Sequence, residues 1–218
     1  KRYDISTVKG SVIVKDFSKE KFKMNLKSNK VNVIKILPGG VVTAKDTAEI
    51  ELDANGEFVR NPEVDLVKVA VVERHQGTGN VACGFLKGYG IKEGAVALSV
   101  AHDSHNIIVV GVNDEEMEFA VNSLIEQEGG IVLVKEGKVI ESMPMPIAGL
   151  MSDQSGEWVD QKLTDIHEKA YEELGICGDV EPVMTLCFMS LAVIPEIKLT
   201  DMGLFDVTTF SFIPVEVE

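Results

Sequence analysis

Two short polar segments hold most of the side chains in this sequence that could carry out chemistry. They are residues 73–80 (Glu-Arg-His-Gln-Gly-Thr-Gly-Asn) and residues 102–106 (His-Asp-Ser-His-Asn). Each follows directly on an apolar run, residues 67–72 and 95–101, and together they contain three of the four histidines of the chain. Polar groups at the ends of strands are typical of ligand sites in sheet proteins.

These side chains suit three kinds of chemistry. Imidazoles and carboxylates can bind a divalent metal, a His–Asp pair such as His102 and Asp103 can move protons near neutral pH, and amide, hydroxyl and guanidinium groups can hydrogen-bond a heteroaromatic base. Three interpretations stay open at this point. The segments form a metal site of their own, they are satisfied polar residues of buried turns, or they contribute to a site shared with another domain or subunit.

Other candidates are weaker. The Gly77–Asn80 string lacks the G-x-G-x-x-G spacing of a dinucleotide site, and no G-x-S-x-G elbow surrounds Ser104. His167 lies in an expected helix and is interpreted as a half-buried packing residue. The odd cysteines, Cys83, Cys177 and Cys187, share no C-x-x-C spacing, which excludes a zinc ribbon and favours buried free thiols in a reducing cytoplasm.

The composition is that of a folded globular chain. It is 45% hydrophobic and 26% charged, with a net charge of −14 from 21 basic and 35 acidic residues. Such a charge disfavours nucleic acid as a partner, because lysine and arginine must neutralise phosphates. The sequence has no continuous apolar run long enough to suggest a membrane span, and no secretory signal is visible.

The pattern of apolar residues predicts an α+β or mixed α/β fold, with a mixed sheet packed with two or three helices. Residues 1–30 are expected to be a connector and residues 31–218 a domain. We expect strands at 31–36, 67–72, 95–101 and 107–110, a hairpin at 131–142, and helices from Asn113 or Asp114 to Glu126 and from Ser155 to Gly175. The remaining stretches predict a short strand at 10–14, a short helix at 19–24, a loop with a short helix at 77–91, a last strand within 207–217, and a buried segment at 182–192 that is either strand or helix.

Several uncommon strings occur in an order that resembles the C-terminal region of bacterial and archaeal adenine deaminases. The two polar segments carry the resemblance first. It continues through residues 107–114 (Ile-Ile-Val-Val-Gly-Val-Asn-Asp), 145–152 (Met-Pro-Ile-Ala-Gly-Leu-Met-Ser) and 201–207 (Asp-Met-Gly-Leu-Phe-Asp-Val). Altogether it covers roughly residues 30–218.

The resemblance implies an amidohydrolase-like enzyme that hydrolyses adenine to hypoxanthine and ammonia. In such enzymes a barrel domain binds a pair of divalent metals, Mn²⁺ or Fe²⁺, which lower the pKa of bound water. No His-x-His string occurs in this chain, so those metal ligands have no counterpart here, and the start at Lys1 agrees with a missing N-terminal barrel. The His-x-Glu and Pro-Cys-x-x-Cys strings of the zinc nucleobase deaminases are absent as well.

The leading hypothesis is therefore the C-terminal domain of a cytoplasmic adenine deaminase, inactive without its barrel and holding no metal itself. We expect it to pack on that barrel and to form a homo-oligomer. The resemblance suggests a catalytic or supporting role for His102, Asp103 and His105, and contact with the purine for Glu73, His75, Asn80 and Asn106. Two alternatives remain: a structural or subunit-interaction module, and an independent metal hydrolase built on residues 102–105.

Overall fold

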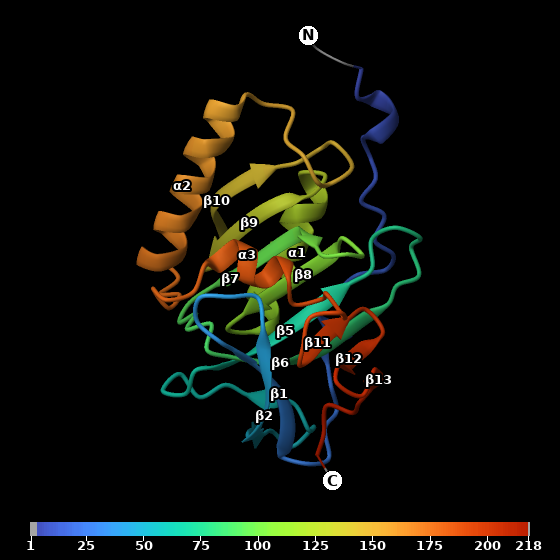
Figure 1. Ribbon diagram of the computed structural model, residues 1–218, viewed down its shortest axis with the longest axis vertical. Helices are drawn as coiled ribbons and strands as arrows, with labels where there is room; N and C mark the ends of the chain where they lie inside the picture. The colour runs from blue at the N-terminus through green and yellow to red at the C-terminus, as the bar shows by residue number, and fades with distance from the viewer. Residues whose placement is uncertain (1–3, 218) are drawn as a thin grey trace.

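A computed structural model describes residues 4–217, which fold around one mixed sheet (Figure 1). Within these residues the sheet has eight strands, and their spatial order is β10 (Lys138–Pro144), β9 (Gly130–Lys135), β7 (Ala95–Ala101), β8 (Asn106–Gly111), β5 (Leu66–Val72), β6 (Val81–Lys87), β1 (Lys30–Ile36) and β2 (Thr43–Glu49). Only β1 and β6 pair in parallel among the neighbouring strands of this described part. The mixed sheet predicted from the sequence is confirmed.

One face of the sheet is covered by helix α1 (Asp114–Glu126) and by the N-terminal segment. The buried side chains of α1 recur every three or four residues, at Met117, Val121 and Leu124, so they form one stripe against the sheet. The Asn113 side chain accepts a hydrogen bond from the Glu116 backbone N–H at 2.8 Å, which begins the helix.

The N-terminal segment, residues 4–29, crosses the same face as an extended strap. It contains two short 3₁₀ turns, Ser6–Val8 and Lys19–Phe22, and the Phe22 ring is fully buried between the sheet and α1. The described part of the expected connector therefore packs on the sheet. Residues 1–3 of that expected connector lie outside the described residues.

The opposite face is covered by α2 (Gly156–Glu172), α3 (Pro182–Cys187) and a small sheet of β11 (Ile197–Thr200), β12 (Gly203–Asp206) and β13 (Ser211–Phe212). Figure 1 shows α2 beside β10, where the two elements are in contact. The undecided segment 182–192 begins as the helix α3, and a two-strand hairpin, β3 (Glu51–Leu52) with β4 (Phe58–Val59), completes the structure.

Several local predictions are wrong. Residues 81–87 form strand β6 rather than a loop and short helix, because β5 and β1 supply backbone partners on both sides. Residues 11–15 are extended but unpaired in a sheet, and the helix at 19–24 is a four-residue 3₁₀ turn. The last strand expected within 207–217 is present as the two-residue β13, and Glu216 adds an isolated β-bridge to Val31.

The cysteine prediction is only partly correct. Cys83 and Cys187 are half-buried, and burial raises the pKa of each thiol to about 12, so both stay protonated. Cys177 is exposed, in the loop between α2 and α3. All three thiols are free, as expected.

No helix among residues 4–217 is both long enough and apolar enough to span a membrane.

Candidate functional site

The two polar segments lie together at one end of the sheet. Strand β5 ends at Val72, whose partner on β8 is Ile107, the second residue of that strand. The antiparallel turn between β7 and β8 consists of residues 102–105. Residues 73–80 and 102–106 therefore leave the sheet side by side, as neighbouring antiparallel strands require.

Glu73 organises the first segment from within. Its side chain is buried, and its carboxylate accepts backbone N–H groups from His75, Gln76 and Thr78 at 2.5, 2.8 and 2.9 Å and the Thr78 hydroxyl at 3.0 Å. Burial works to raise the pKa of Glu73, but the hydrogen bonds outweigh it and lower the pKa to about 2. The charge of Glu73 is thus committed to holding its own loop.

The second segment turns its rings outward. The His102 and Asp103 side chains are 38% and 81% exposed, and their Nδ1 and Oδ1 atoms lie 3.6 Å apart. The His102 ring stacks on Phe188 with centroids 5.0 Å apart, and it meets His105 edge-on at 5.2 Å. These residues form a small patch with aromatic and acidic character at the surface.

His105 is held more tightly than His102. Its backbone has φ +54°, a left-handed conformation that costs a non-glycine residue free energy. Its Nδ1 is buried without a hydrogen-bond partner in the described chain. Burial, followed by the proximity of His102 and Arg74, lowers the pKa of His105, which favours the neutral form of the ring.

His75 connects the two segments. It is exposed, and its Nε2 donates a hydrogen bond to the Ser104 carbonyl oxygen at 2.7 Å. The bond fixes the proton on Nε2, because a carbonyl can only accept. His75 therefore braces the 102–105 turn from the side of the neighbouring loop.

Asn80 and Asn106 meet at Asp201, a residue that the sequence reasoning left outside the candidate site. Asp201 lies in the turn between β11 and β12, and each of its carboxylate oxygens accepts one asparagine Nδ2 at 3.3 Å. Asn106 is buried and Asn80 is exposed. Asp201 thus ties both polar segments to the small sheet, an arrangement that no spacing in the sequence indicates.

These donors do not fit a metal pair. Among residues 4–217, no three or more His, Cys, Asp or Glu side chains gather as a metal ion requires. The Glu73 carboxylate accepts hydrogen bonds from backbone N–H groups, and the Asp201 carboxylate accepts them from two asparagine amides. The third histidine, His75, is engaged by the Ser104 carbonyl. No step of the chemistry is therefore assigned to a metal on these residues.

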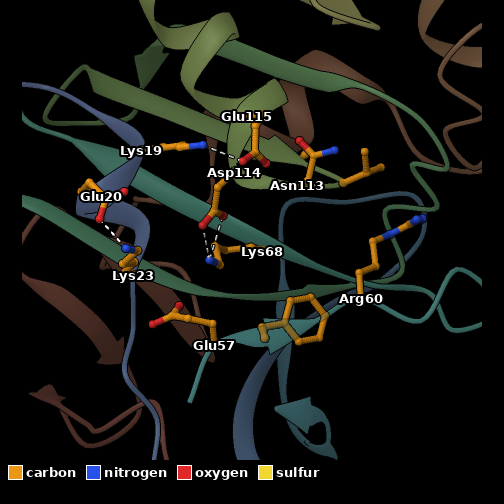
Figure 2. A pocket seen from close by; sticks show the side chains of 12 residues that line it. Lys19, Glu20, Lys23, Glu57, Arg60, Lys68, Asn113, Asp114 and Glu115 are labelled. Atoms are coloured by element: carbon orange, nitrogen blue, oxygen red, sulfur yellow. Dashed lines mark hydrogen bonds and ion pairs between the residues drawn. The ribbon is translucent and has the colours of Figure 1, made fainter. Parts of the chain in front are cut away.

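A cavity of about 460 Å³ lies elsewhere, at the N-terminal end of α1 (Figure 2). Figure 2 shows three ion pairs at its wall, Lys19 with Glu115, Lys23 with Glu20, and Lys68 with Asp114, whereas the labelled Glu57 and Arg60 form no ion pair with the described residues there. Lys68 is buried and also donates to the Phe22 carbonyl at 3.0 Å. The contacts of Lys19 and Lys68 join the strap to α1 beside the cavity.

Comparison with known proteins gives one consistent result. The family model described as "Adenine deaminase C-terminal domain" matches residues 40–211. Adenine deaminase 2 of Desulfotalea psychrophila is 67% identical over 216 residues, which are 99% of this chain and 38% of that protein. Adenine deaminase of Ligilactobacillus salivarius is 48% identical over 216 residues, 99% of this chain and 37% of that protein. The chain thus spans less than two fifths of the length of these relatives.

Proposed function

The chain belongs to the adenine deaminase family, and on that premise we propose that it supports the hydrolysis of adenine to hypoxanthine and ammonia. The observation that carries this proposal is the surface patch made by His102, Asp103 and His105, which is open to an external group at the end of the sheet. Adenine is proposed as the substrate because the relatives are named adenine deaminases.

In this proposal the patch completes an active site whose metal chemistry belongs to an amidohydrolase barrel. The donors among residues 4–217 do not fit a metal pair, so Mn²⁺ or Fe²⁺ is assigned to that barrel. The chain alone is then inactive. Its part is to close the site on one side and to exclude water from it.

The geometry of the patch suits a purine or a side chain that orients one. The His102 ring stacked on Phe188 offers a flat surface, and the exposed Asp103 carboxylate can accept an N–H of a base. Neutral His105 can share a hydrogen bond without repelling a cation. His75 serves the purine indirectly, since its Nε2 is used by the turn.

The other candidate purine contacts divide into buried and exposed residues. Glu73 and Asn106 are buried, and both hold neighbouring groups of this domain. Asn80 is exposed, so it keeps part of its amide for a ligand while bonded to Asp201. We therefore assign contact with the purine to the 102–105 turn first and to Asn80 second.

A second candidate function is that of an interaction module. Met202, beside Asp201 in the β11–β12 turn, is 72% exposed, and Phe210 and Phe212 in the β12–β13 hairpin of the same small sheet are 72% and 52% exposed. Several exposed apolar side chains on one small sheet favour a subunit or domain contact there. A homo-oligomer and a cytoplasmic location belong to this proposal too, the second supported by three free cysteines.

The test is an adenine hydrolysis assay on two proteins. One is this chain alone with Mn²⁺ or Fe²⁺ added, and the other is a chimera in which it replaces the matching 216 residues of the Desulfotalea psychrophila enzyme. We expect turnover by the chimera and none by the chain alone. Turnover by the chain alone favours the independent hydrolase, and an inactive but metal-loaded, folded chimera contradicts the proposed support.

A further inference from the structure

The guanidinium of Arg74 is buried in this domain without an acidic partner. Arg74 is 1% exposed, and no carboxylate of residues 4–217 forms an ion pair with it. Its Nη1 has no hydrogen-bond partner among the described groups. Burying a charge is unfavourable unless it is compensated, so an arginine here is a poor way to stabilise a fold. Its contacts indicate what it does instead.

The side chain binds three carbonyl oxygens from three separate segments. Nε donates to His105 at 2.6 Å, and Nη2 donates to Ser99 at 3.3 Å and to Ala148 at 3.2 Å. The planar fork of a guanidinium holds such acceptors in a fixed relative geometry, which an ammonium group cannot do. Arg74 therefore fixes the end of β7, the 102–105 turn and the 147–151 turn relative to one another.

The backbone of Arg74 extends the same set of connections. Its N–H donates to the Asn106 side chain at 3.3 Å, and its carbonyl accepts the Ile13 N–H of the strap at 2.8 Å. The strap returns to the same place, since the Ala148 N–H donates to the Val8 carbonyl at 3.0 Å. One residue thus connects the strap, the first polar segment and the second.

Gly149 lies directly against the guanidinium of Arg74. A Cβ on Gly149 would lie 2.9 Å from Arg74 Nη1 and 3.0 Å from its central carbon, and the residue has φ +71°. The Gly149 carbonyl accepts the Ser99 hydroxyl at 2.6 Å, and that hydroxyl accepts the Gly130 N–H at 2.7 Å. The 147–151 turn is therefore closed onto Arg74 with no room for a larger side chain.

From these contacts we propose that Arg74 is the positioning residue of the patch: it holds the His105 carbonyl and the two flanking segments, and so gives the His102 and His105 rings one orientation. The inference concerns the same patch as the proposed function and rests on it for its importance to adenine hydrolysis. The geometry itself is testable without adenine or metal. Arg74 acts on the patch only through the turns that it holds.

The experiment is an NMR titration of the four histidine rings in the 218-residue chain and its variants. Arg74→Met removes the charge and the three hydrogen bonds, while Arg74→Lys keeps only the charge. In Arg74→Met we expect the His105 resonances to move and the pKa of His105 to rise, because water reaches the ring and the nearby positive charge is lost. His167, on α2 beside Glu181, is the internal control and stays unchanged.

Arg74→Lys separates position from charge. If the geometry of the guanidinium, and not its charge, orients the rings, the His102 and His105 resonances broaden or shift in Arg74→Lys as well, although the charge remains. Gly149→Ala keeps the arginine and displaces it, so it should give the same pattern even where Arg74→Met fails to fold. Unchanged His102 and His105 resonances in folded Arg74→Lys and Gly149→Ala overturn the inference, whatever the outcome of the adenine assay.

Discussion

The two polar segments differ in the direction of their functional groups, although each follows a buried strand. In residues 73–80, Glu73 points inward and satisfies the loop around it. In residues 102–106, the rings of His102 and His105 and the carboxylate of Asp103 lie at the surface or beside it. Apart from the exposed Asn80, the first segment is therefore a scaffold, and the second segment carries the groups that are open to a ligand.

The difference has consequences for mutagenesis. A buried carboxylate with several donors should control stability, whereas an exposed ring should control function. The same substitution type at the two segments therefore separates the two roles. The expected loss of stability is largest at Glu73, smaller at Asp201 and smallest at His102.

Replacing Glu73 with Ala should destabilise the chain most. The substitution leaves three backbone N–H groups and the Thr78 hydroxyl without their acceptor, at a cost of about 3 kcal/mol or more. Urea unfolding followed by circular dichroism measures the change. The matched control is Glu63→Ala at an exposed loop position, which should change stability by only about 0.5 kcal/mol. Equal effects of the two substitutions would remove the scaffold role.

Acid should act on the same carboxylate. Glu73 has a pKa of about 2 in the folded chain against an ordinary 4.5, so its contribution is present above the ordinary pKa and is lost as the pH falls through the folded one. The difference corresponds to about 3 kcal/mol. We expect the wild-type unfolding free energy to fall with acid more steeply than that of Glu73→Gln. Parallel pH curves for the two proteins contradict this assignment.

Replacing Asp201 with Ala should have an intermediate effect. Both asparagine amides lose their acceptor, but the two bonds are long at 3.3 Å. Because Asn80 can also turn to water, we expect a cost of about 1 kcal/mol. Hydrogen exchange in the β11–β12 turn is the sharper measurement. Faster exchange there, with unchanged exchange in α1, supports the link, and unchanged exchange in both regions excludes it.

Replacing His102 with Ala should change stability least. The ring is partly exposed and gives up its stacking on Phe188 and its edge-on contact with His105, each worth about 0.5 kcal/mol at such an exposed position. The thermal midpoint measures the change, and His167→Ala on α2 is the comparison. A loss as large as that of Glu73→Ala would make the second segment a scaffold too.

Much of the fold could be predicted from the sequence, because apolar periodicity and caps act locally. The buried strands β5, β7 and β8 and the Asn113 cap of α1 follow directly from those signals. Strand β6 could not be predicted, because it contains Gly84, and glycine is more typical of loops than of strands. Only its pairing with β5 and β1 makes this segment a strand. The side chains of Leu199 and Leu204 lie close to Gly84, a contact between segments far apart in the sequence.

The candidate site was predicted in part. Strand-end position drew attention to both segments, and the structure shows that they lie side by side, but spacing cannot show which way a side chain points. Glu73 is directed inward by the N–H groups of its own loop, and the roles of Arg74 and Asp201 depend on segments distant in sequence. Such contacts form only after the sheet and its two layers are assembled.

In the proposed function the 102–105 turn serves adenine hydrolysis, and kinetics of the chimera test this role. We would measure kcat and KM for adenine in the chimera that carries His102→Ala and His105→Ala together, beside His167→Ala as control. We predict a fall in kcat/KM of about tenfold or more with the metal content and the thermal midpoint nearly kept. Wild-type kinetics in the folded double variant would contradict the claim and leave this chain as a structural or subunit-interaction module.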